Sequence, residues 1–387
     1  MDPFLRRFGI AAVLLLGFVI AVNSLVDPYR LFPWNGIPAV RDYETKRGSR
    51  AYKSGQVAGG GYDFLILGSS RADVGYDPMQ SVLVSSSAYN AALAGTSMFE
   101  ALEVLDLATH HHPGLRTVLL GVDLVMFNEA VDFGEDNRIS LLNPEMGRTA
   151  RWVELLLSWE ATEASMATVL SRARRERSIY SLQGWCQHIS DRLGQIPVRS
   201  RFARSLATFA GPSGHYGAFS LDPEKLSSVD SALAMALRND LVVRVVLSPI
   251  HATQMDLIHR MGRWEDFETM KESLLTSTLA AREKGLDVEL WDFAGFGVPQ
   301  TEVVPPDSVP EMVFFWENSH FKAELGNQVL AQVFGGVSGP GVLLSRENMD
   351  AWMARTREDH ERWREEHPAE SEWVATIAGG NGRPSGL

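Results

Sequence analysis

The chain is poor in cysteine and in basic residues, and each deficit excludes a class of protein. Its one cysteine, Cys186, rules out an intramolecular disulfide and leaves the redox compartment open. Its 36 Lys and Arg against 48 Asp and Glu give a formal net charge of −12. Nucleic acid is therefore not an expected partner, because nucleic-acid binding depends on Lys and Arg that neutralise phosphates. With 45% apolar and 22% charged residues, the chain is neither disordered nor multi-spanning.

One long apolar run is present, at Phe8–Val26. As a helix it would be about 28 Å long, close to the hydrocarbon thickness of about 30 Å. Arg6 and Arg7 precede the run, so the positive-inside rule places the N-terminus in the cytoplasm and the rest of the chain outside it. A cleaved signal peptide is the alternative, but residues 22–24 (VNS) match the small-residue pattern of a cleavage site poorly.

Beyond this run, short apolar segments alternate with helical patterns. The helical patterns cover Ser97–His111 and Ala252–Lys284. Strands that alternate with helices predict an α/β fold with a parallel sheet and right-handed crossovers. The expected strands are Tyr62–Leu67, Arg116–Gly121, Leu241–Leu247, Val288–Trp291 and Met312–Phe315.

The composition changes along the chain and indicates several parts. A segment rich in Pro, Gly and aromatic residues follows the anchor and predicts an irregular linker, and a helical, Arg-rich insertion interrupts the α/β rhythm and is expected to cap the site. Trp352 and Trp363 share one face of the charged C-terminal helix, which predicts packing on the domain or on a partner protein. The expected parts are an anchor (residues 1–27), a linker (28–60) and an α/β domain (61–340) that contains the insertion (about 130–215). A charged helix with a flexible tail (341–387) follows.

Residues with hydroxyl, imidazole and carboxylate groups follow the predicted strands. In an open parallel sheet ligands bind at the carboxyl ends of the strands, so these positions are the candidates for a site. A serine attacks an acyl carbon only if a base takes its proton, and the base needs a carboxylate to orient it. Ser70, His320 and Glu317 supply these three groups. The backbone amides of Ser70 and Gly95 are candidate donors to the oxyanion that such an attack creates.

Four segments carry a resemblance to a known family: LGSSRADVGYDP, NAALAGTSMFEAL, VLLGVDLVMF and WENSHFKAELGNQVL. In this order they resemble the four blocks of the SGNH/GDSL hydrolase superfamily, and they cover most of the chain outside the insertion and the tail. The resemblance implies a flavodoxin-like parallel sheet flanked by helices, with Ser70 as nucleophile and His320 as base. Ser69 and Glu317 stand where the family has Asp.

The GSS variant and the anchor are similar to two envelope branches of that superfamily, the periplasmic alginate O-acetylation proteins and the D-alanyl-transfer protein of teichoic acid synthesis. Both imply a serine-dependent acyltransferase or esterase that acts on acyl groups of a cell-envelope or exported polysaccharide. They imply a single-pass protein of the bacterial inner membrane whose main domain is periplasmic or extracytoplasmic, with a membrane-bound acyltransferase as candidate partner and no cofactor. Transfer and hydrolysis differ only in the acceptor and stay open. A non-catalytic SGNH-like scaffold that binds a glycan or an envelope assembly partner is the alternative.

One departure from the family favours the scaffold. Asp123 stands where the family has an Asn that helps to hold the oxyanion, and a carboxylate there repels the oxyanion unless it is protonated or turned away. Asn90 and Arg71 are candidate substitutes as donors, and Arg71 is also a candidate for binding substrate. His251, after the third predicted strand, either binds substrate at the mouth of the site or hydrogen-bonds loop backbone.

Three consecutive histidines, His110, His111 and His112, suggest a metal site at first sight. They end a predicted helix just before Pro113-Gly114, where histidines interact favourably with the helix dipole. Capping is the favoured interpretation, and no metal site is predicted.

Overall fold

The computed structural model describes residues 2–30, 49–131, 142–174, 178–187, 189, 193–306 and 311–380. Within them the chain forms a six-stranded sheet in the order β2-β1-β3-β4-β5-β6. The pairs from β2 to β5 are all parallel, and only β6 runs antiparallel to its neighbour β5. The strands are β1 Phe64–Gly68, β2 Ala88–Asn90, β3 Thr117–Val122, β4 Val242–Leu247, β5 Asp287–Asp292 and β6 Val342–Leu343.

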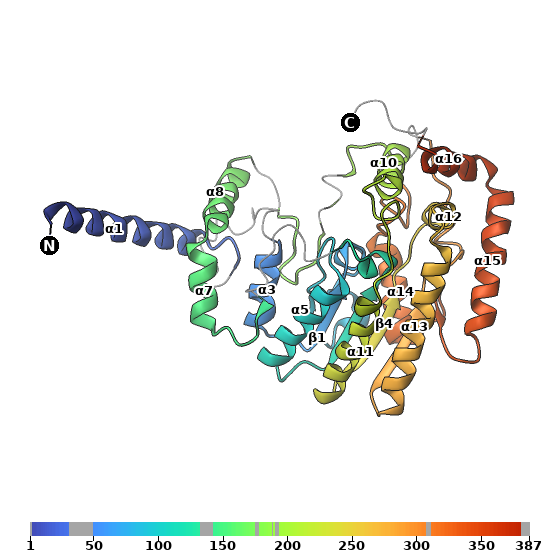
Figure 1. Ribbon diagram of the computed structural model, residues 1–387, viewed down its shortest axis with the longest axis horizontal. Coiled ribbons are helices and arrows are strands. Elements are labelled where there is room, and N and C mark those ends of the chain that lie inside the picture. The colour runs from blue at the N-terminus through green and yellow to red at the C-terminus, as the bar shows by residue number, and fades with distance from the viewer. Residues whose placement is uncertain are drawn as a thin grey trace.

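Both faces of the sheet are buried, as expected of continuously apolar parallel strands. In β1, Leu65 and Leu67 point to one face, whereas Phe64 and Ile66 point to the other, and the two sets belong to separate apolar clusters. Figure 1 shows α5, α11 and α13 in front of the sheet and α14 behind it. The helices that pack on the sheet are α4 Ser70–Gly75, α5 Met98–His111, α11 Pro223–Arg238, α12 Ala252–Arg260, α13 Trp264–Glu283 and α14 Ala323–Gly335, with the short 3₁₀ turns η1 Ser81–Leu83 and η2 Leu124–Phe127.

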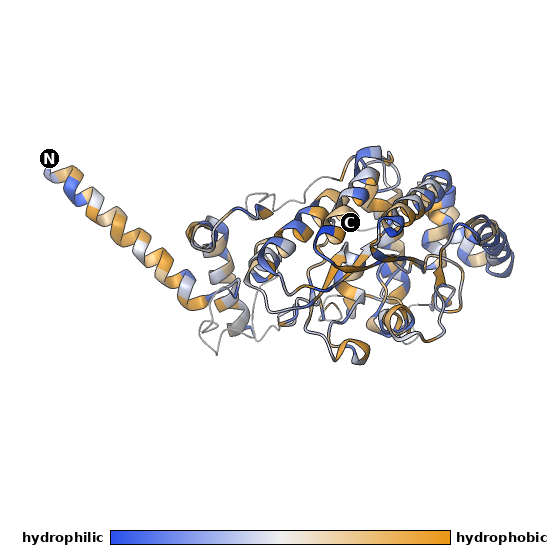
Figure 2. Cartoon of the chain, turned by 90° about the horizontal axis from the view of Figure 1, so that it is seen from below, coloured by the Kyte–Doolittle hydropathy of each residue, from blue (hydrophilic) through white to orange (hydrophobic). Residues whose placement is uncertain are grey.

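The N-terminal helix α1 (Pro3–Val26) projects from this body, and most of its length is apolar (Figure 2). Among the described helices it alone is long and apolar enough to cross a membrane. Its C-terminal end lies against two helices of the insertion, α7 (Arg148–Leu157) and α8 (Trp159–Ala173). A third helix of the insertion, α10 (Val198–Ala210), packs instead on the body, against α12 and α16.

The predicted linker is partly helical. Residues 49–59 form α3 (Ser49–Gly59), which packs against α5, so the expectation of an irregular segment is wrong for this part. The remainder of the linker that follows Arg30 lies outside the described residues. The sequence pattern missed α3 because its buried face contains Lys53, Ser54 and Gly55 and so lacks an apolar stripe.

The expected strand at Met312–Phe315 is absent from the described structure, where Phe315 forms only a single bridge with Phe321. The predicted helix over Ala252–Lys284 is two helices, α12 and α13, separated at Gly262, which has a φ of +69°.

The C-terminal charged segment also packs on the domain. It forms α15 (Met349–Glu366) and α16 (Pro368–Ala378), and α16 begins at a proline that ends the preceding helix. The Trp352 indole donates to Asp292 Oδ2 at 2.8 Å, and Trp363 is buried. The expected flexible end, residues 381–387, lies outside the described residues.

Candidate active site

The candidate site lies where the chain changes direction across the sheet. From β1 the chain crosses to β2 on one side, and from β3 it crosses to β4 on the other, so the carboxyl ends of β1 and β3 lie at the switch point of the sheet, the place where open α/β sheets bind ligands. Gly68 ends β1 with a φ of +142°, and a Cβ there would lie 2.4 Å from the carbonyl oxygen of Gly121. Only glycine fits this close approach of the two strands. Ser69 then caps α4, and Ser70 is the first residue of that helix.

The three residues of the predicted relay are in hydrogen-bond contact. The Ser70 hydroxyl lies 2.8 Å from His320 Nε2, and His320 Nδ1 contacts Glu317 Oε1. With Nδ1–H donating to the carboxylate, Nε2 is left as the acceptor for the serine proton. Glu317 is buried, whereas 24% of the His320 side chain is exposed. The serine and the histidine that the sequence assigned as nucleophile and base therefore lie within hydrogen-bond distance of one another.

Glu317 is held as a carboxylate by its own turn. Its Oε2 accepts from the Ser319 amide at 2.8 Å and its Oε1 accepts from the His320 amide at 3.0 Å. Burial raises the pKa of the Glu317 carboxyl, but the charge and hydrogen bond of His320, with hydrogen bonds from Ser205 and Ser319, lower it to a net value below the ordinary one. The carboxylate is thus ionised and oriented at neutral pH.

A small hairpin brings His320 to Ser70. Phe315 and Phe321 pair across it, both are fully buried, and Glu317–His320 forms its tip. The Phe321 ring packs where a side chain at Gly75 would be, because a Cβ at Gly75 would lie 1.9 Å from that ring. Gly75 therefore lets the hairpin settle on α4, the helix that begins with Ser70.

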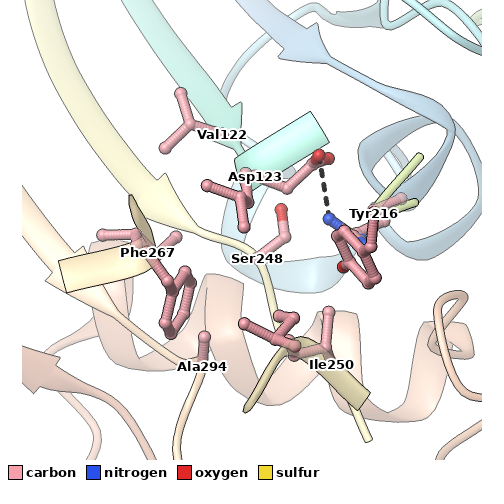
Figure 3. A pocket seen from close by; sticks show the side chains of 11 residues that line it. Val122, Asp123, Tyr216, Ser248, Ile250, Phe267 and Ala294 are labelled. Atoms are coloured by element: carbon pink, nitrogen blue, oxygen red, sulfur yellow. Dashed lines mark ion pairs between the residues drawn. The ribbon is translucent and has the colours of Figure 1, made fainter. Parts of the chain in front are cut away.

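The carboxylate of Asp123 is turned toward a cation. Its Oδ1 lies 2.9 Å from Arg71 Nη1, and its Oδ2 accepts a hydrogen bond from the Ser69 hydroxyl. Oδ1 also accepts from the Val125 amide at 3.1 Å, which caps η2. Figure 3 shows this ion pair beside Tyr216. A negative charge at this position is therefore neutralised inside the protein.

The sequence made Arg71 a candidate for binding substrate, and the structure places it as a buried link between loops. Its side chain is buried, and its Nε lies 3.2 Å from both the carbonyl oxygen and the hydroxyl of Ser319. Burial alone would lower the pKa of the guanidinium, but Asp123, followed by Tyr216 and Glu317, raises it overall. Arg71 thus joins the Ser70 turn, the Asp123 turn and the His320 hairpin, and we assign it a positioning role.

Asn90 is not placed to stabilise an oxyanion. Its amide nitrogen donates to the carbonyl oxygens of Ala72 and Tyr76, both at 2.9 Å, and its oxygen accepts from the Ala92 amide at 3.0 Å. Its two donors are used inside the fold, so the expectation from the sequence is wrong. Gly95, by contrast, is exposed with a φ of +66°, and its amide has no partner among the described residues.

The side chain of His251 is not accessible to a substrate. It is fully buried, its Nδ1 lies 2.9 Å from the Thr253 hydroxyl, and its Nε2 lies 2.6 Å from the carbonyl oxygen of Glu302. Of the two interpretations that the sequence left open, the structure shows the bond to loop backbone. His251 caps α12 and does not line the site.

His251 should make stability depend on pH. Burial lowers its pKa to about 4, against the ordinary value of 6.5. The unfolded chain takes up this proton below about pH 6.5 and the folded protein only near pH 4, so the free energy of unfolding should fall by about 3 kcal/mol over this range. Urea unfolding of the wild type at about pH 7 and pH 5 should show about 2 kcal/mol of this loss, and His251→Asn, which keeps a capping side chain, should reduce it. An equal fall in the free energy of unfolding in both proteins would show that His251 is not the source of the pH dependence.

A cavity lies behind the Arg71–Asp123 pair. Its lining includes Val122, Ser248, Ile250, Phe267 and Ala294 (Figure 3). It has room for about one water molecule, and neither Ser70 nor His320 lines it. It is therefore not the place where an ester substrate binds.

Two further groups at the site were not predicted. Lys53 of α3 is buried and its Nζ lies 2.6 Å from Asp73, one turn after Ser70, while Tyr180 donates to the same carboxylate at 3.3 Å. Burial raises the pKa of Asp73 even though Lys53 opposes the shift. Tyr216, just after the insertion, lies close to Arg71 and contributes to the raised pKa of its guanidinium. None of these contacts has a sequence signal, since each joins segments far apart in the chain.

The three histidines lie at the end of α5, as the sequence suggested. His112 Nε2 contacts the carbonyl oxygen of Val57 at 2.7 Å. Within the described residues, no group of three or more His, Cys, Asp or Glu is arranged to hold a metal ion.

No family model, curated protein or solved structure matches this chain. What can be said of its function therefore rests on its residues and their geometry.

Proposed function

We propose that the protein is an SGNH-type serine acyltransferase or esterase of the bacterial envelope. The observation that carries the proposal is the Ser70–His320–Glu317 relay, with the serine hydroxyl 2.8 Å from the imidazole and the imidazole held by a buried carboxylate. Strand order supports the SGNH assignment, since β2-β1-β3-β4-β5 is the order of flavodoxin-like sheets, which bind ligands at the switch point beside β1.

In the proposed reaction, Ser70 Oγ attacks the carbonyl carbon of an acyl ester while its proton passes to His320 Nε2. Glu317 stabilises the imidazolium that results. The backbone amides of Ser70 and Gly95 are the proposed donors to the oxyanion, in keeping with the absence of partners for the Gly95 amide among the described residues. The alcohol leaves with the proton from His320, and a sugar hydroxyl or water then takes the acyl group from Ser70 by the reverse steps.

The envelope location and the polysaccharide substrate rest on other features. α1 is long and apolar enough to span a membrane, and Arg6 and Arg7 at its start favour export of the body. The polysaccharide acceptor rests on the resemblance to envelope acyl-transfer proteins. An alkaline phosphatase domain fused after residue 60 should be active if the body is exported, and an inactive fusion would contradict an envelope role.

The catalytic proposal predicts that a fluorophosphonate probe labels Ser70. An activated serine attacks the phosphorus atom, whereas an ordinary serine does not react. Peptide mass spectrometry should place the adduct on Ser70 and not on the adjacent Ser69, and Ser70→Ala should abolish labelling. Ser85→Ala, which changes an exposed serine, is the matched control and should leave labelling unchanged. A folded protein that takes up no probe would leave the non-catalytic scaffold as the function.

A further inference from the structure

The insertion helices α7 and α8 hold the end of α1 at a fixed point. Asn23 of α1 is fully buried between them, and its amide nitrogen lies 2.7 Å from the Leu156 carbonyl oxygen of α7. The same nitrogen lies 3.2 Å from the Thr162 hydroxyl of α8, and its oxygen accepts from the Ser165 hydroxyl at 2.8 Å. An apolar helix thus carries one buried polar residue, whose partners are all in the insertion.

This contact lies at the level of the membrane boundary if α1 spans the bilayer. Asn23 is three residues before the end of α1 at Val26, or about 4.5 Å along the helix axis. In Figure 1, α7 and α8 run crosswise to α1 at its C-terminal end, between α1 and the body. Helices crosswise to a spanning helix lie along the membrane surface.

One face of α8 carries three exposed apolar side chains, with the half-buried Glu163 among them. Ala161, Ala164, Ser165 and Thr168 form its buried face. On another face, Trp159, Met166 and Leu170 are 73%, 59% and 53% exposed. Their spacings of seven and four residues put the three side chains on one side of the helix. Val169 beside them and Val153 of α7 are also exposed.

We propose that the α7–α8 hairpin lies in the outer surface of the lipid bilayer, with Trp159, Met166 and Leu170 inserted among the lipid chains. Lipid is the occupant that this face fits, because the hairpin packs against the end of the apolar helix α1 and the face carries a tryptophan, which favours the membrane interface. The nearby Glu160 and Glu163 carry negative charge, so apolar burial and not attraction to anionic lipids drives the contact.

Two contacts with the membrane, one by α1 and one by the hairpin, would fix the height and tilt of the body. The Ser70 site would then be held at a fixed distance from the bilayer, which suits a substrate that is itself held at the membrane surface. This inference rests on the anchoring role proposed for α1 and is independent of the catalytic proposal.

Spin labels on the full-length chain test the inference. In a Cys186→Ser background, single cysteines replace Met166 or Leu170, and the labelled proteins are reconstituted in bilayers of phosphatidylcholine alone. Collision rates with oxygen, which concentrates in lipid, and with a water-soluble nickel complex are then measured. Val298→Cys, in the loop after β5, replaces a residue that is 84% exposed and is the aqueous control. Val13→Cys, on the exposed surface of α1, is the lipid control.

Labels at 166 and 170 should resemble the label at 13, with frequent oxygen and rare nickel collisions, and should lie about 5–10 Å below the headgroup boundary. Labels at 166 and 170 that resemble the label at 298, while the label at 13 reports lipid, would overturn the inference. Labels that exclude both reagents and broaden one another's spectra would show a second copy on this face, and would also overturn it. A water-exposed label at 13 would remove the anchor and with it this inference, but would leave the Ser70 chemistry untouched.

Discussion

Replacing Ser70 by alanine is expected to lower the turnover of a model acetyl ester by at least about 10³-fold, because the change removes the attacking atom of the proposed relay. The fold should survive, since Ser70 is only half-buried and its hydroxyl bonds only His320 among the described residues. Initial rates with 4-nitrophenyl acetate, with unfolding midpoints measured on the same preparations, give the comparison.

The relay also predicts how the losses of activity in two single variants combine in the double variant. Ser70 and His320 act as one unit, so His320→Ala should cost about as much as Ser70→Ala, and the double variant should fall no further than either single variant. Glu317→Gln should be less severe, because it removes the negative charge that stabilises the imidazolium but keeps a side chain of the same shape. Losses that multiply in the double variant would show that the two residues act separately, and would contradict the relay.

The strands that position the site could be predicted because both of their faces are buried. Four runs, including Tyr62–Leu67 and Leu241–Leu247, correspond to β1, β3, β4 and β5 to within about two residues. The position of a polar residue that directly follows a buried strand is set by that strand, so Ser70 could be assigned to the carboxyl edge of the sheet from the sequence. The spacing of Glu317 and His320 was equally informative, since a turn of this length leaves little freedom in their relative position.

Contacts that depend on several distant segments could not be predicted. Asn90 and Arg71 have donors, but whether those donors are free depends on carbonyl oxygens and carboxylates that only the folded chain brings near. Lys53 is an extreme example, because a lysine in a segment without an apolar stripe gives no sign that it is buried beside Asp73. β2 and β6, of three and two residues, are too short for a periodic pattern.

The second large effect is expected at Asp123. On the family pattern alone, Asp123→Asn would restore an oxyanion donor and could raise the rate by about 10²–10³-fold. The structure favours the opposite result. The carboxylate is the ionic partner of Arg71, and the amide that replaces it would leave a buried guanidinium without a counter-charge. Removing one partner of a buried ion pair costs about 3–5 kcal/mol of stability.

We therefore expect Asp123→Asn to lower both the urea midpoint of unfolding and the rate with 4-nitrophenyl acetate. The rate should fall because Arg71, released from Asp123, no longer holds Ser319 and the hairpin that carries His320. The matched double variant combines Arg71→Met with Asp123→Asn and so removes the unpaired buried guanidinium. It should recover much of the lost stability. Recovery of stability without recovery of the rate would mark Arg71 as a positioning residue. A rise in rate for Asp123→Asn alone would instead place Asp123 against the oxyanion and show that its pairing with Arg71 does not shield the reaction.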